Sequence, residues 1–579
     1  MPNMIQNAKD SISQILNAAY QKAAEKGELP AGAALSGTVE IPKDSANGDF
    51  AANHAMAGAK ALHMAPRKIA EALIANADLA DTWFASVEVA GPGFINFRLA
   101  DRWYADVLKA VTEEGTDYGR SDIGHGQKVM VEFVSANPTG PMHMGNARGG
   151  VLGDALASVL DRAGYQVWRE FYVNDAGNQI EKFANSIDAR YQQLLLGEDQ
   201  VAFPEDGYHG DDIKDLAKLF YEANGDKYLT VPVAERHQAM AEFGLQRNIP
   251  KMQEDLRRYG IEYDQWFFES ELHESGYVAE SVQKLTDRGY TYEKDGALWL
   301  KTSQILTEQL LKAGKKQEEI DKLELKDDVL RRANGFYTYF AADIAYHRNK
   351  LEKRGFDKVI NVWGADHHGH VARLKGAMDA LGLEGEHRLD IVLMQLVKLT
   401  RNGEVVRMSK RTGKAISLTD LLDEIPVDAA RYFFNSRPES PVEFDLELAI
   451  RQDSENPVYY VQYAHARICT LLSALAAEGH TVPASADASL LSTAEEKELI
   501  KQLAALPEEI RLAARDYDPS RINRYVTELA ARFHRFYTVC RIKGAESDVQ
   551  AARLLLADCV RRVIAVSLGI IGVTAPEKM

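Results

Sequence analysis

The sequence predicts an α/β protein in which a parallel-sheet domain carries a helical insertion and lies between a small α+β domain and an all-α domain. Three observations support this prediction. Apolar strand patterns alternate with helical patterns from residue 128 to 173 and again from 336 to 398, and the 579-residue chain is almost entirely helical after Asn456. Because parallel strands need crossover connections, which are usually helices, this alternation is typical of a Rossmann-type sheet.

The N-terminal domain is predicted at residues 1–112. Its helical patterns run over Met4 to Lys26 and Ala51 to Ile74, and its strand patterns over Trp83 to Ala90 and Phe94 to Leu99. Gly91-Pro92-Gly93 lies between the two strand patterns and favours a hairpin turn. Residues 113–127 are rich in Gly, Asp and Ser and read as a linker that opens a catalytic domain at 113–455.

The catalytic domain reads as two halves of one sheet. The first half is a strand (Lys128 to Ser135), a loop (Asn137 to Pro141), a helix (Gly145 to Ala163) ending at Gly164, and a strand (Gln166 to Val173). The second half is a helix (Phe336 to Lys353), a strand (Lys358 to Trp363), a helix (His370 to Leu381) and a strand (Leu389 to Lys398). An insertion at about 180–330 separates them; it is helix-rich, with a possible hairpin near Tyr290 to Leu300. Residues 456–579 form the predicted C-terminal domain.

Composition excludes several classes of protein. The net charge of −17 argues against a nonspecific nucleic-acid coat protein, although local basic patches can still bind nucleic acid. The sequence has no apolar stretch of about 18 residues, so we expect no membrane span. The polar N-terminus does not resemble a secretory signal. Three separated cysteines fit neither a disulfide framework nor a zinc knuckle, and we expect a cytoplasmic protein.

The C-terminal segment is locally basic. Between Arg511 and Arg562 there are eleven Lys and Arg residues and six acids, a local charge of +5. Basic and aromatic residues are interleaved there: Arg521, Arg524, Tyr525, Arg532, Phe533, Arg535, Phe536, Tyr537 and Arg541. Solvated helix faces explain the charges equally simply, and many of the aromatic residues must belong to the core of a helix bundle.

A first candidate site is the loop between the first strand and its helix. His143-Met144-Gly145-Asn146 stands where an open α/β sheet has its ligand crevice, beside a helix N-terminus that favours phosphate. Gly145 permits a close backbone approach, and His143 and Asn146 can donate hydrogen bonds to phosphate oxygens. The alternative interpretation is a turn with a capping Asn146.

A second candidate site lies just after the last predicted strand. Residues 407–414 read RMSKRTGK, a basic, glycine-containing sequence. Lys410 is a compact, mobile cation suited to a pyrophosphate leaving group, and Ser409 can add a hydrogen bond. A loop of this kind can close on ATP and reopen to release product. The alternative interpretation is an exposed basic turn.

Together the two loops resemble the paired signatures of class I aminoacyl-tRNA synthetases. The sequence departs from the usual motifs at Asn146, where the first motif has His, and at Arg407, where the second has Lys. Arg407 keeps the charge but not the geometry of an ammonium, so Lys410 is the expected catalytic cation. The resemblance implies ATP-binding roles for His143, Gly145, Asn146, Met408, Ser409 and Lys410, and catalytic roles for His143, Asn146 and Lys410.

Other segments resemble the arginyl-tRNA synthetase family in particular. They are VEFVSANPTGPMHMGNARGGVLGDALASVLDRAGYQVWREFYVND from Val131, YTYFAADIAYH from Tyr337, VWGADHHGH from Val362, and the ending GVTAPEKM. Asp428-Ala429-Ala430-Arg431 matches a D-A-L-R string of that family, with Ala for Leu. The resemblance spans nearly the full chain and is weak in the insertion.

The resemblance implies an arginine site made of Glu132, Ser135, Asn137, His143, Tyr339, Asp343 and His367. A carboxylate matches the planar N–H donors of a guanidinium bidentately. Tyr339 and Asp343 are four residues apart and share one helix face. The alternatives are a sheet-edge ion pair for Glu132 and a partner role toward His347 for Asp343.

The resemblance also implies ligation of arginine to tRNA(Arg) through arginyl-adenylate, with release of AMP and pyrophosphate. The N-terminal domain would contact the tRNA elbow and the C-terminal domain would read the anticodon, in a protein expected to be a monomer. ATP implies Mg²⁺, carried largely by the phosphates. We expect no zinc, because the HHGH run at 367–370 lacks the spacing of a tetrahedral site. The remaining rivals are a synthetase for cysteine, glutamate or lysine, and a noncatalytic tRNA-binding relative.

Overall fold

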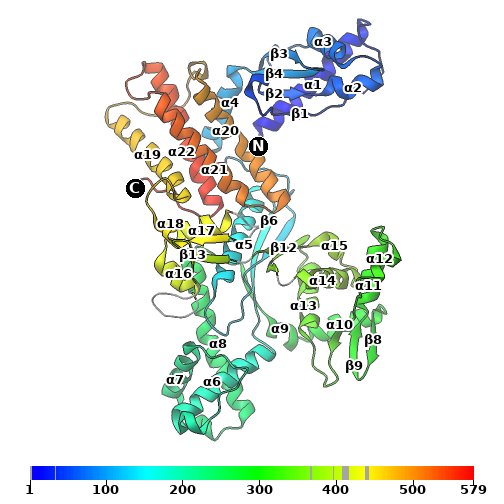
Figure 1. The fold of residues 1–579 in the computed structure, drawn as a ribbon, viewed down its shortest axis with the longest axis vertical. Coiled ribbons are helices and arrows are strands. Elements are labelled where there is room, and N and C mark those ends of the chain that lie inside the picture. The colour runs from blue at the N-terminus through cyan, green and yellow to red at the C-terminus, as the bar shows by residue number, and fades with distance from the viewer. Residues whose placement is uncertain (1–2, 33, 366–367, 396, 407–415, 437–441) are drawn as a thin grey trace.

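The computed structural model describes residues 3–32, 34–365, 368–395, 397–406, 416–436 and 442–579. Figure 1 shows the N-terminal domain and the C-terminal helices at one end, the central sheet in the middle, and two lobes that project from the sheet. The predicted fold class is confirmed. None of the helices in these ranges is long and apolar enough to cross a membrane.

The central sheet is parallel throughout. Its strands are β5 (Lys128–Glu132), β6 (Gln166–Val173), β7 (Gln265–Phe268), β11 (Lys358–Gly364) and β12 (Leu389–Met394). Their order in space is β12-β11-β5-β6-β7, so the two halves of the chain meet where β5 pairs with β11. The sheet order changes direction at that junction, which is where ligand crevices form in open α/β sheets.

Two strand predictions need correction. β5 ends at Glu132 rather than at Ser135, because Val134 and Ser135 adopt φ values of 71° and 45°, which an extended strand cannot contain. The predicted strand Leu389 to Lys398 is two strands: β12 ends at Met394, and β13 (Val397–Arg401) belongs to a second sheet. There β13 pairs with β14 (Glu404–Val405) and β15 (Val442–Asp445).

The helices that flank the sheet follow the predicted order. They are α5 (Met144–Arg162), α13 (Tyr339–Arg348), the π-helical turn η5 (Asn349–Lys353), α14 (His368–Ala380) and α15 (Gly385–Arg388). The helix predicted from Phe336 begins three residues later, because the Thr338 side chain caps it by accepting from Ala341 N. The chain then continues through α16 (Leu418–Glu424), α17 (Val427–Asn435) and α18 (Leu446–Ile450).

The predicted insertion is two lobes with a sheet strand between them. The first contains α6 (Asn178–Leu196), α7 (Asp211–Asn224) and α8 (Val233–Arg258), packed around a core of their own. The second contains α9 (Glu269–Glu274), α10 (Tyr277–Asp287), α11 (Thr302–Lys312), α12 (Gln317–Asp321), the hairpin of β8 (Thr291–Lys294) and β9 (Ala297–Leu300), and β10 (Asp328–Arg331). Thus the expected hairpin is present, and the sequence analysis missed β7.

The N-terminal domain contains an antiparallel sheet. Its elements are α1 (Met4–Glu25), β1 (Val39–Glu40), β2 (Phe50–Ala52), α2 (His54–Leu62), α3 (Pro66–Asn76), β3 (Phe84–Ala90) and β4 (Phe94–Leu99). β3 and β4 form the predicted hairpin. The single helix predicted from Ala51 to Ile74 is wrong, because residues 50–52 pair with β4 and the helix breaks at His63, where φ is 50°.

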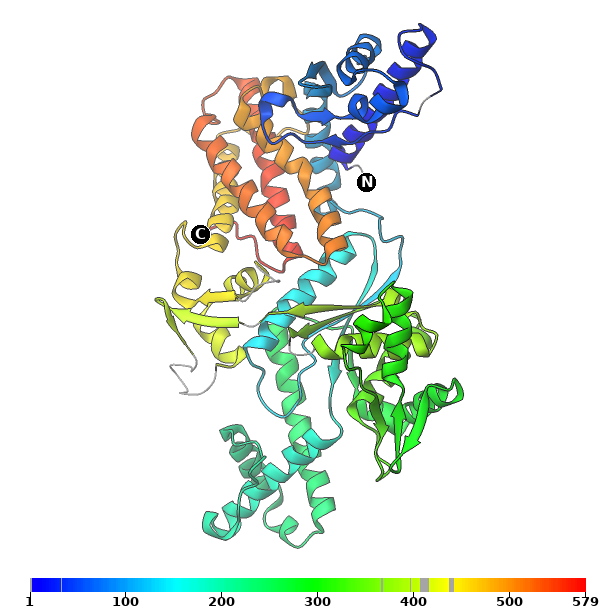
Figure 2. The ribbon, with the colours of Figure 1, turned by 45° about the vertical axis from the view of Figure 1, so that its right-hand side comes forward.

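The C-terminal helices form a bundle against the helix that begins at the candidate phosphate loop. They are α19 (Pro457–Ala477), α20 (Ala494–Asp516), α21 (Ser520–Val539) and α22 (Ser547–Ile570). α20 and α22 pack against α5 and against α4 (Asp101–Glu114), so the bundle contacts both the catalytic domain and the N-terminal part of the chain. Figure 2 shows this bundle directly above α5.

Candidate active site

The first candidate loop is the N-terminus of α5. The Nδ1 atom of His143 accepts a hydrogen bond from Gly145 N at 3.2 Å, and Asn146 Oδ1 accepts one from His143 N at 3.0 Å. Asn146 is therefore a capping residue, as the simpler interpretation expected. The amide nitrogen of Asn146 has no hydrogen-bond partner among the described residues. Because Nδ1 of His143 accepts, the ring proton lies on Nε2 and can be donated. Desolvation lowers the pKa of His143, which favours this neutral form.

The second candidate loop, Arg407 to Lys414, lies outside the described residues, and so do its predicted site residues Met408, Ser409 and Lys410. The described segments on either side of it approach the first loop. Ser417 pairs with His143 in an antiparallel bridge, and Leu418 N donates to Met142 O at 2.8 Å. The folded chain therefore brings the flank of the second motif against the first, although they are more than 250 residues apart.

A pocket of about 520 Å³ lies between the N-terminus of α5 and the hairpin of β13 and β14. It is lined by His143, Met144, Gly145, Val397, Lys398, Leu399, Val405, Val406 and Ile416. Most of these side chains are apolar, while the α5 N-terminus supplies positive potential; the Lys398 ammonium is paired with Glu443 at 2.6 Å. The volume and the mixed lining suit a ligand with a flat apolar part and an anionic part.

Glu132 and Ser135 lie together at the carboxyl end of β5. The Ser135 hydroxyl donates to Glu132 Oε1 at 2.8 Å, and Lys350 Nζ donates to Glu132 Oε2 at 2.6 Å. Glu132 is 5% exposed and Lys350 is fully buried. The alternative interpretation of Glu132 as an ion-pair residue therefore describes the structure, and each carboxylate oxygen has a protein partner.

Asp343 faces the same edge of the sheet from α13. His370 Nε2 lies 3.0 Å from Asp343 Oδ2, and the guanidinium of Arg373 donates to His370 Nδ1 at 3.3 Å. Because an arginine can only donate, Nδ1 is the acceptor and Nε2 carries the proton that reaches Asp343. The side chain of Asp343 is 34% exposed, which leaves it accessible to a cation. In the alternative interpretation Asp343 is a partner of His347. This holds only for the backbone of Asp343, whose carbonyl oxygen lies 2.8 Å from His347 Nδ1.

The remaining predicted arginine ligands are spread around this edge. Tyr339 is 42% exposed and lies against Gly177, at the start of α6. Asn137 is exposed in the loop after β5. His367 lies outside the described residues.

Sequence reasoning missed two residues of this edge, Tyr172 and Glu269. Burial raises the pKa of Tyr172 well above its ordinary value, and the negative charges of Glu269, Asp343 and Glu132 raise that pKa further. Glu269 is buried at the first residue of α9, directly after β7. The only signal for it in the sequence was its position after that short strand. The sheet edge thus gathers three acids, of which Glu132 is paired with Lys350 and Asp343 remains partly exposed.

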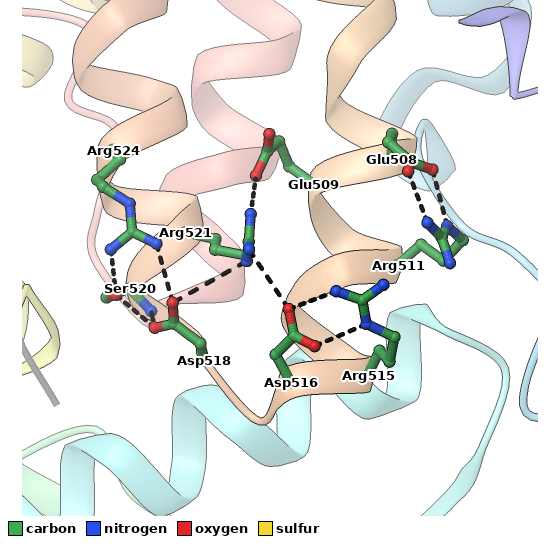
Figure 3. Close-up of polar contacts among 9 residues, drawn as sticks. All are labelled: Glu508, Glu509, Arg511, Arg515, Asp516, Asp518, Ser520, Arg521 and Arg524. Carbon is green, nitrogen blue, oxygen red and sulfur yellow. Dashed lines mark hydrogen bonds and ion pairs between the residues drawn. The ribbon is translucent and has the colours of Figure 1, made fainter. Parts of the chain in front are cut away.

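The basic C-terminal segment divides into paired and unpaired residues. Figure 3 shows four arginines at the turn from α20 to α21, each directed at carboxylates of the same turn. The N–O distances are 2.7 Å for Arg511–Glu508, 2.6 Å for Arg515–Asp516, 3.4 Å for Arg521–Glu509 and 2.9 Å for Arg524–Asp518. Arg532, Lys543, Arg553, Arg561 and Arg562 are paired with acids as well, so most of the local positive charge is neutralised within the bundle.

Another face of the bundle carries aromatic rings, of which that of Tyr463 is exposed and those of Tyr459, His534 and Tyr537 are partly buried. The rings of Tyr459 and Tyr463 on α19 stack at 6.1 Å with an interplanar angle of 8°, and the ring of His534 on α21 lies 6.1 Å from Tyr463. The guanidinium of Arg467 lies 4.1 Å from the centre of the Tyr537 ring. By contrast, Tyr525, Phe533 and Phe536 are buried in the core.

Three family models match the chain. They are an arginyl tRNA synthetase N terminal domain at residues 6–99, a catalytic domain of class I tRNA synthetases (R) at 107–440, and a DALR anticodon binding domain at 461–579. Curated arginine--tRNA ligases of Acetivibrio thermocellus and Caldanaerobacter subterraneus are 52% and 54% identical to it, each over the full length of both chains.

Solved structures agree with these similarities. A putative arginyl-tRNA synthetase of Campylobacter jejuni is 33% identical, with a TM-score of 0.73, and the match covers 83% of this chain and 100% of that one. The arginyl-tRNA synthetase of Thermus thermophilus matches 98% of this chain and 100% of its own with a TM-score of 0.72; at 21% identity this shows a shared fold.

Proposed function

The chain belongs to the arginyl-tRNA synthetase family, and from that premise we propose how its residues join arginine to tRNA(Arg) with ATP. The arginine carboxylate attacks the α-phosphate of ATP, forming arginyl-adenylate and releasing pyrophosphate. A terminal ribose hydroxyl of the tRNA then attacks the activated carbonyl and releases AMP. The observation that carries the proposal is the partly exposed carboxylate of Asp343 at the carboxyl edge of the sheet whose first helix, α5, begins at the candidate phosphate loop: the first suits a cation and the second suits phosphate.

ATP would lie in the pocket between β13 and α5. The apolar side chains of Met144, Leu399 and Val406 suit the adenine ring, and the α5 N-terminus suits the phosphates. His143 would donate from Nε2 to a phosphate oxygen, and Asn146 from its amide. Gly145 keeps the approach to the backbone open. Met408, Ser409 and Lys410 are proposed on sequence grounds to close over the pyrophosphate.

Mg²⁺ would enter with ATP. The described lining of the pocket contains no carboxylate, so phosphate oxygens and water are the expected ligands of the ion. Its chemistry there is to neutralise phosphate charge during the displacement.

Arginine would lie across the ends of β5 and β11. Asp343 would bind the guanidinium through a carboxylate that His370 holds in place, with Tyr339 beside it and with Glu132 and Ser135 below. Asn137, His143 and His367 would serve the amino-acid head group near the ATP. No protein nucleophile is needed, because positioning and charge stabilisation supply the acceleration.

The tRNA would be held at both ends of the chain. The stacked rings of Tyr459, Tyr463 and His534, with Arg467 and Arg535 nearby, form a stacking platform suited to unpaired anticodon bases. Residues 1–112 would contact the tRNA elbow, 113–455 would carry the chemistry, and 456–579 would read the anticodon. We propose that the enzyme acts as a monomer in the cytoplasm.

Amino-acid-dependent ATP–pyrophosphate exchange, with each of the standard amino acids and with tRNA present, tests the proposal. Among the amino acids tested, we expect only arginine to support exchange, and we expect charging of tRNA that accepts arginine. His143→Ala is expected to reduce exchange about 10²-fold or more, and His125→Ala, in an exposed turn, is the matched control. Exchange with another amino acid, or charging that is unaffected by His143→Ala, would contradict the proposal.

A further inference from the structure

Lys350 is a fully buried lysine at the carboxyl edge of the central sheet. Its ammonium nitrogen lies 2.6 Å from Glu132 Oε2, 3.3 Å from Asn361 Oδ1 and 3.5 Å from His347 Nε2, and 4.0 Å from the centre of the Tyr346 ring. Glu132 Oε2 and Asn361 Oδ1 accept from the ammonium, and the Tyr346 ring faces it. The geometry therefore suits the charged form of the lysine.

The neighbours of Lys350 have fixed proton positions. The His347 Nδ1 atom lies 2.8 Å from the Asp343 carbonyl, so it must donate, and Nε2 accepts from Asn361 Nδ2 at 2.6 Å. His347 is therefore neutral, and burial, followed by the charge of Lys350, lowers its pKa well below the ordinary value. The positive charge of this cluster belongs to Lys350 alone, and its counter-charge is Glu132.

The cluster continues through Glu132 to a strained turn. Ser135 Oγ donates to Glu132 and accepts from Tyr172 N at 3.2 Å. Val134 and Ser135 hold positive φ values that non-glycine residues rarely adopt, above all a β-branched valine. Such strain persists only where the surroundings hold it. The hydroxyl of Ser135, anchored between Glu132 and β6, is that support, and the turn leads directly to Asn137 and the His143 loop.

The position of Lys350 in the chain explains how it reaches Glu132. It lies in the π-helical turn η5, after α13 has ended at Arg348. Arg348 points to the opposite side, where it donates to Ser281 Oγ at 3.0 Å. The wider turn directs Lys350 at the sheet, and single-turn π-helices are frequent at functional sites.

We propose that Lys350 is a positioning residue of this active site. It fixes the Glu132 carboxylate and, through Ser135, the turn after β5. It also cancels the charge of Glu132, so that the charge of Asp343 recognises the guanidinium. This inference rests on the proposed function, in which Glu132 and Asp343 line the arginine site. The other acids nearby have separate partners: Glu170 pairs with Arg354, and His273 Nε2 lies 3.3 Å from Glu269.

Removing the charges of Glu132 and Lys350 one after the other tests this inference. Glu132→Gln leaves the Lys350 charge unbalanced beside the guanidinium, so we expect the KM for arginine to rise on the order of 10²-fold while the KM for ATP changes little. Adding Lys350→Met removes that charge, and the double variant should recover at least tenfold of the lost arginine affinity. If Glu132 acted only as a direct ligand, the double variant would be no better than Glu132→Gln, and this result would overturn the inference.

Two further variants keep the test decisive. Lys353→Met makes the same substitution at an exposed position of the same turn and should leave every constant unchanged. Ser135→Ala breaks the link to the strained turn without changing any charge, and we expect it to lower kcat about tenfold; a wild-type kcat would overturn the proposed link even if the charged variants failed to fold. Absence of arginine-dependent exchange in the unmodified enzyme would instead contradict the proposed function itself.

Discussion

At the scale of single residues, the carboxylate of Asp343 has the clearest geometry for a guanidinium. It is partly exposed at the sheet edge, and a histidine that can only donate holds one of its oxygens. Among the described residues, the side chain has no second hydrogen-bond partner, so the other oxygen can accept from the ligand. Glu132, by comparison, already accepts from two protein groups.

Replacing Asp343 with Asn should weaken the use of arginine much more than the use of ATP. The amide keeps the shape but loses the charge and the bidentate acceptance, and a buried hydrogen bond to a charged group contributes about 1.5–3 kcal/mol. Steady-state exchange kinetics should therefore show an increase of roughly 10- to 100-fold in the KM for arginine. Asp295→Asn, in the exposed turn between β8 and β9, is the matched control. Unchanged arginine kinetics would assign Asp343 a structural role.

Replacing Lys410 with Ala should slow activation while leaving tRNA binding nearly unchanged. Loss of one preorganised charge contact to a leaving group costs about 10²–10³ in rate. Arg407→Lys, which changes the other cation of the motif but keeps its charge, should remain active. Pre-steady-state measurement of adenylate formation distinguishes these variants, and a near wild-type rate for Lys410→Ala would rule its role out.

At the scale of secondary-structure elements, helix α17 connects the catalytic domain to the bundle. The fully buried guanidinium of Arg431 contacts Asp154 on α5 at 2.5 Å, donates to Tyr259 O at 3.0 Å, and donates to Ile571 O at 3.2 Å. Asp428, at the other end of the same motif, accepts from Gln462 at 2.8 Å. The Asp428 to Arg431 string therefore joins α5, the end of the first lobe of the insertion, α19 and the C-terminal tail.

Arg431→Met should destabilise the whole chain by about 3–5 kcal/mol, because it leaves Asp154 with Arg169 alone as its ion-pair partner and removes the donor to the buried carbonyls of Tyr259 and Ile571. Gly572 packs closely against the same side chain, because a Cβ at this position would lie 2.0 Å from the Arg431 guanidinium. Denaturant unfolding followed by fluorescence measures the change. Arg451→Met, at an exposed position, should shift the midpoint little. An unshifted midpoint for Arg431→Met would show that this junction contributes little stability.

At the scale of the whole molecule, the bundle packs directly on the helix that begins at His143. α20 and α22 contact α5, and Tyr517 donates to Asp390 on β12 at 2.9 Å. A tRNA bound to the bundle can therefore favour one arrangement of the catalytic loops, in proportion to its preference for that arrangement. Deleting residues 457–579 is a poor test of this coupling, because it would also uncover the apolar side of α5.

Exchange without tRNA should be close to background, and tRNA that accepts arginine should switch it on. The resemblance to the family motivates this expectation, and the contact between bundle and α5 gives it a physical route. Tyr463→Ala weakens the proposed base-stacking platform and should raise the tRNA concentration needed for activation about tenfold or more, given about 1–3 kcal/mol per stacked base. Robust exchange by the intact enzyme without tRNA would contradict the coupling and leave the enzyme assignment untouched.

The sequence by itself determined the order of strands and helices around the first motif, and the family. β6 has its predicted bounds, and the β3–β4 hairpin and the close of α5 before Gly164 lie where turn residues indicated them. These features depend on local properties: apolar periodicity, the conformational freedom of glycine, and capping by His143 and Asn146. The proposed site residues follow from motifs, and those at 367 and 408–410 stay sequence predictions.

Only the tertiary structure decided which charges meet. β7 was missed because a four-residue strand is recognisable only through its pairing with β6, and Leu389 to Lys398 was read as one strand because two adjacent strands of different sheets share one apolar pattern. The sequence contains the arginines of the bundle and the acids that pair with them, but only the structure shows which of them form ion pairs. Lys350 and Glu132 are 218 residues apart, so no local pattern could join them; burial, which makes an unpaired charge costly, brought them together.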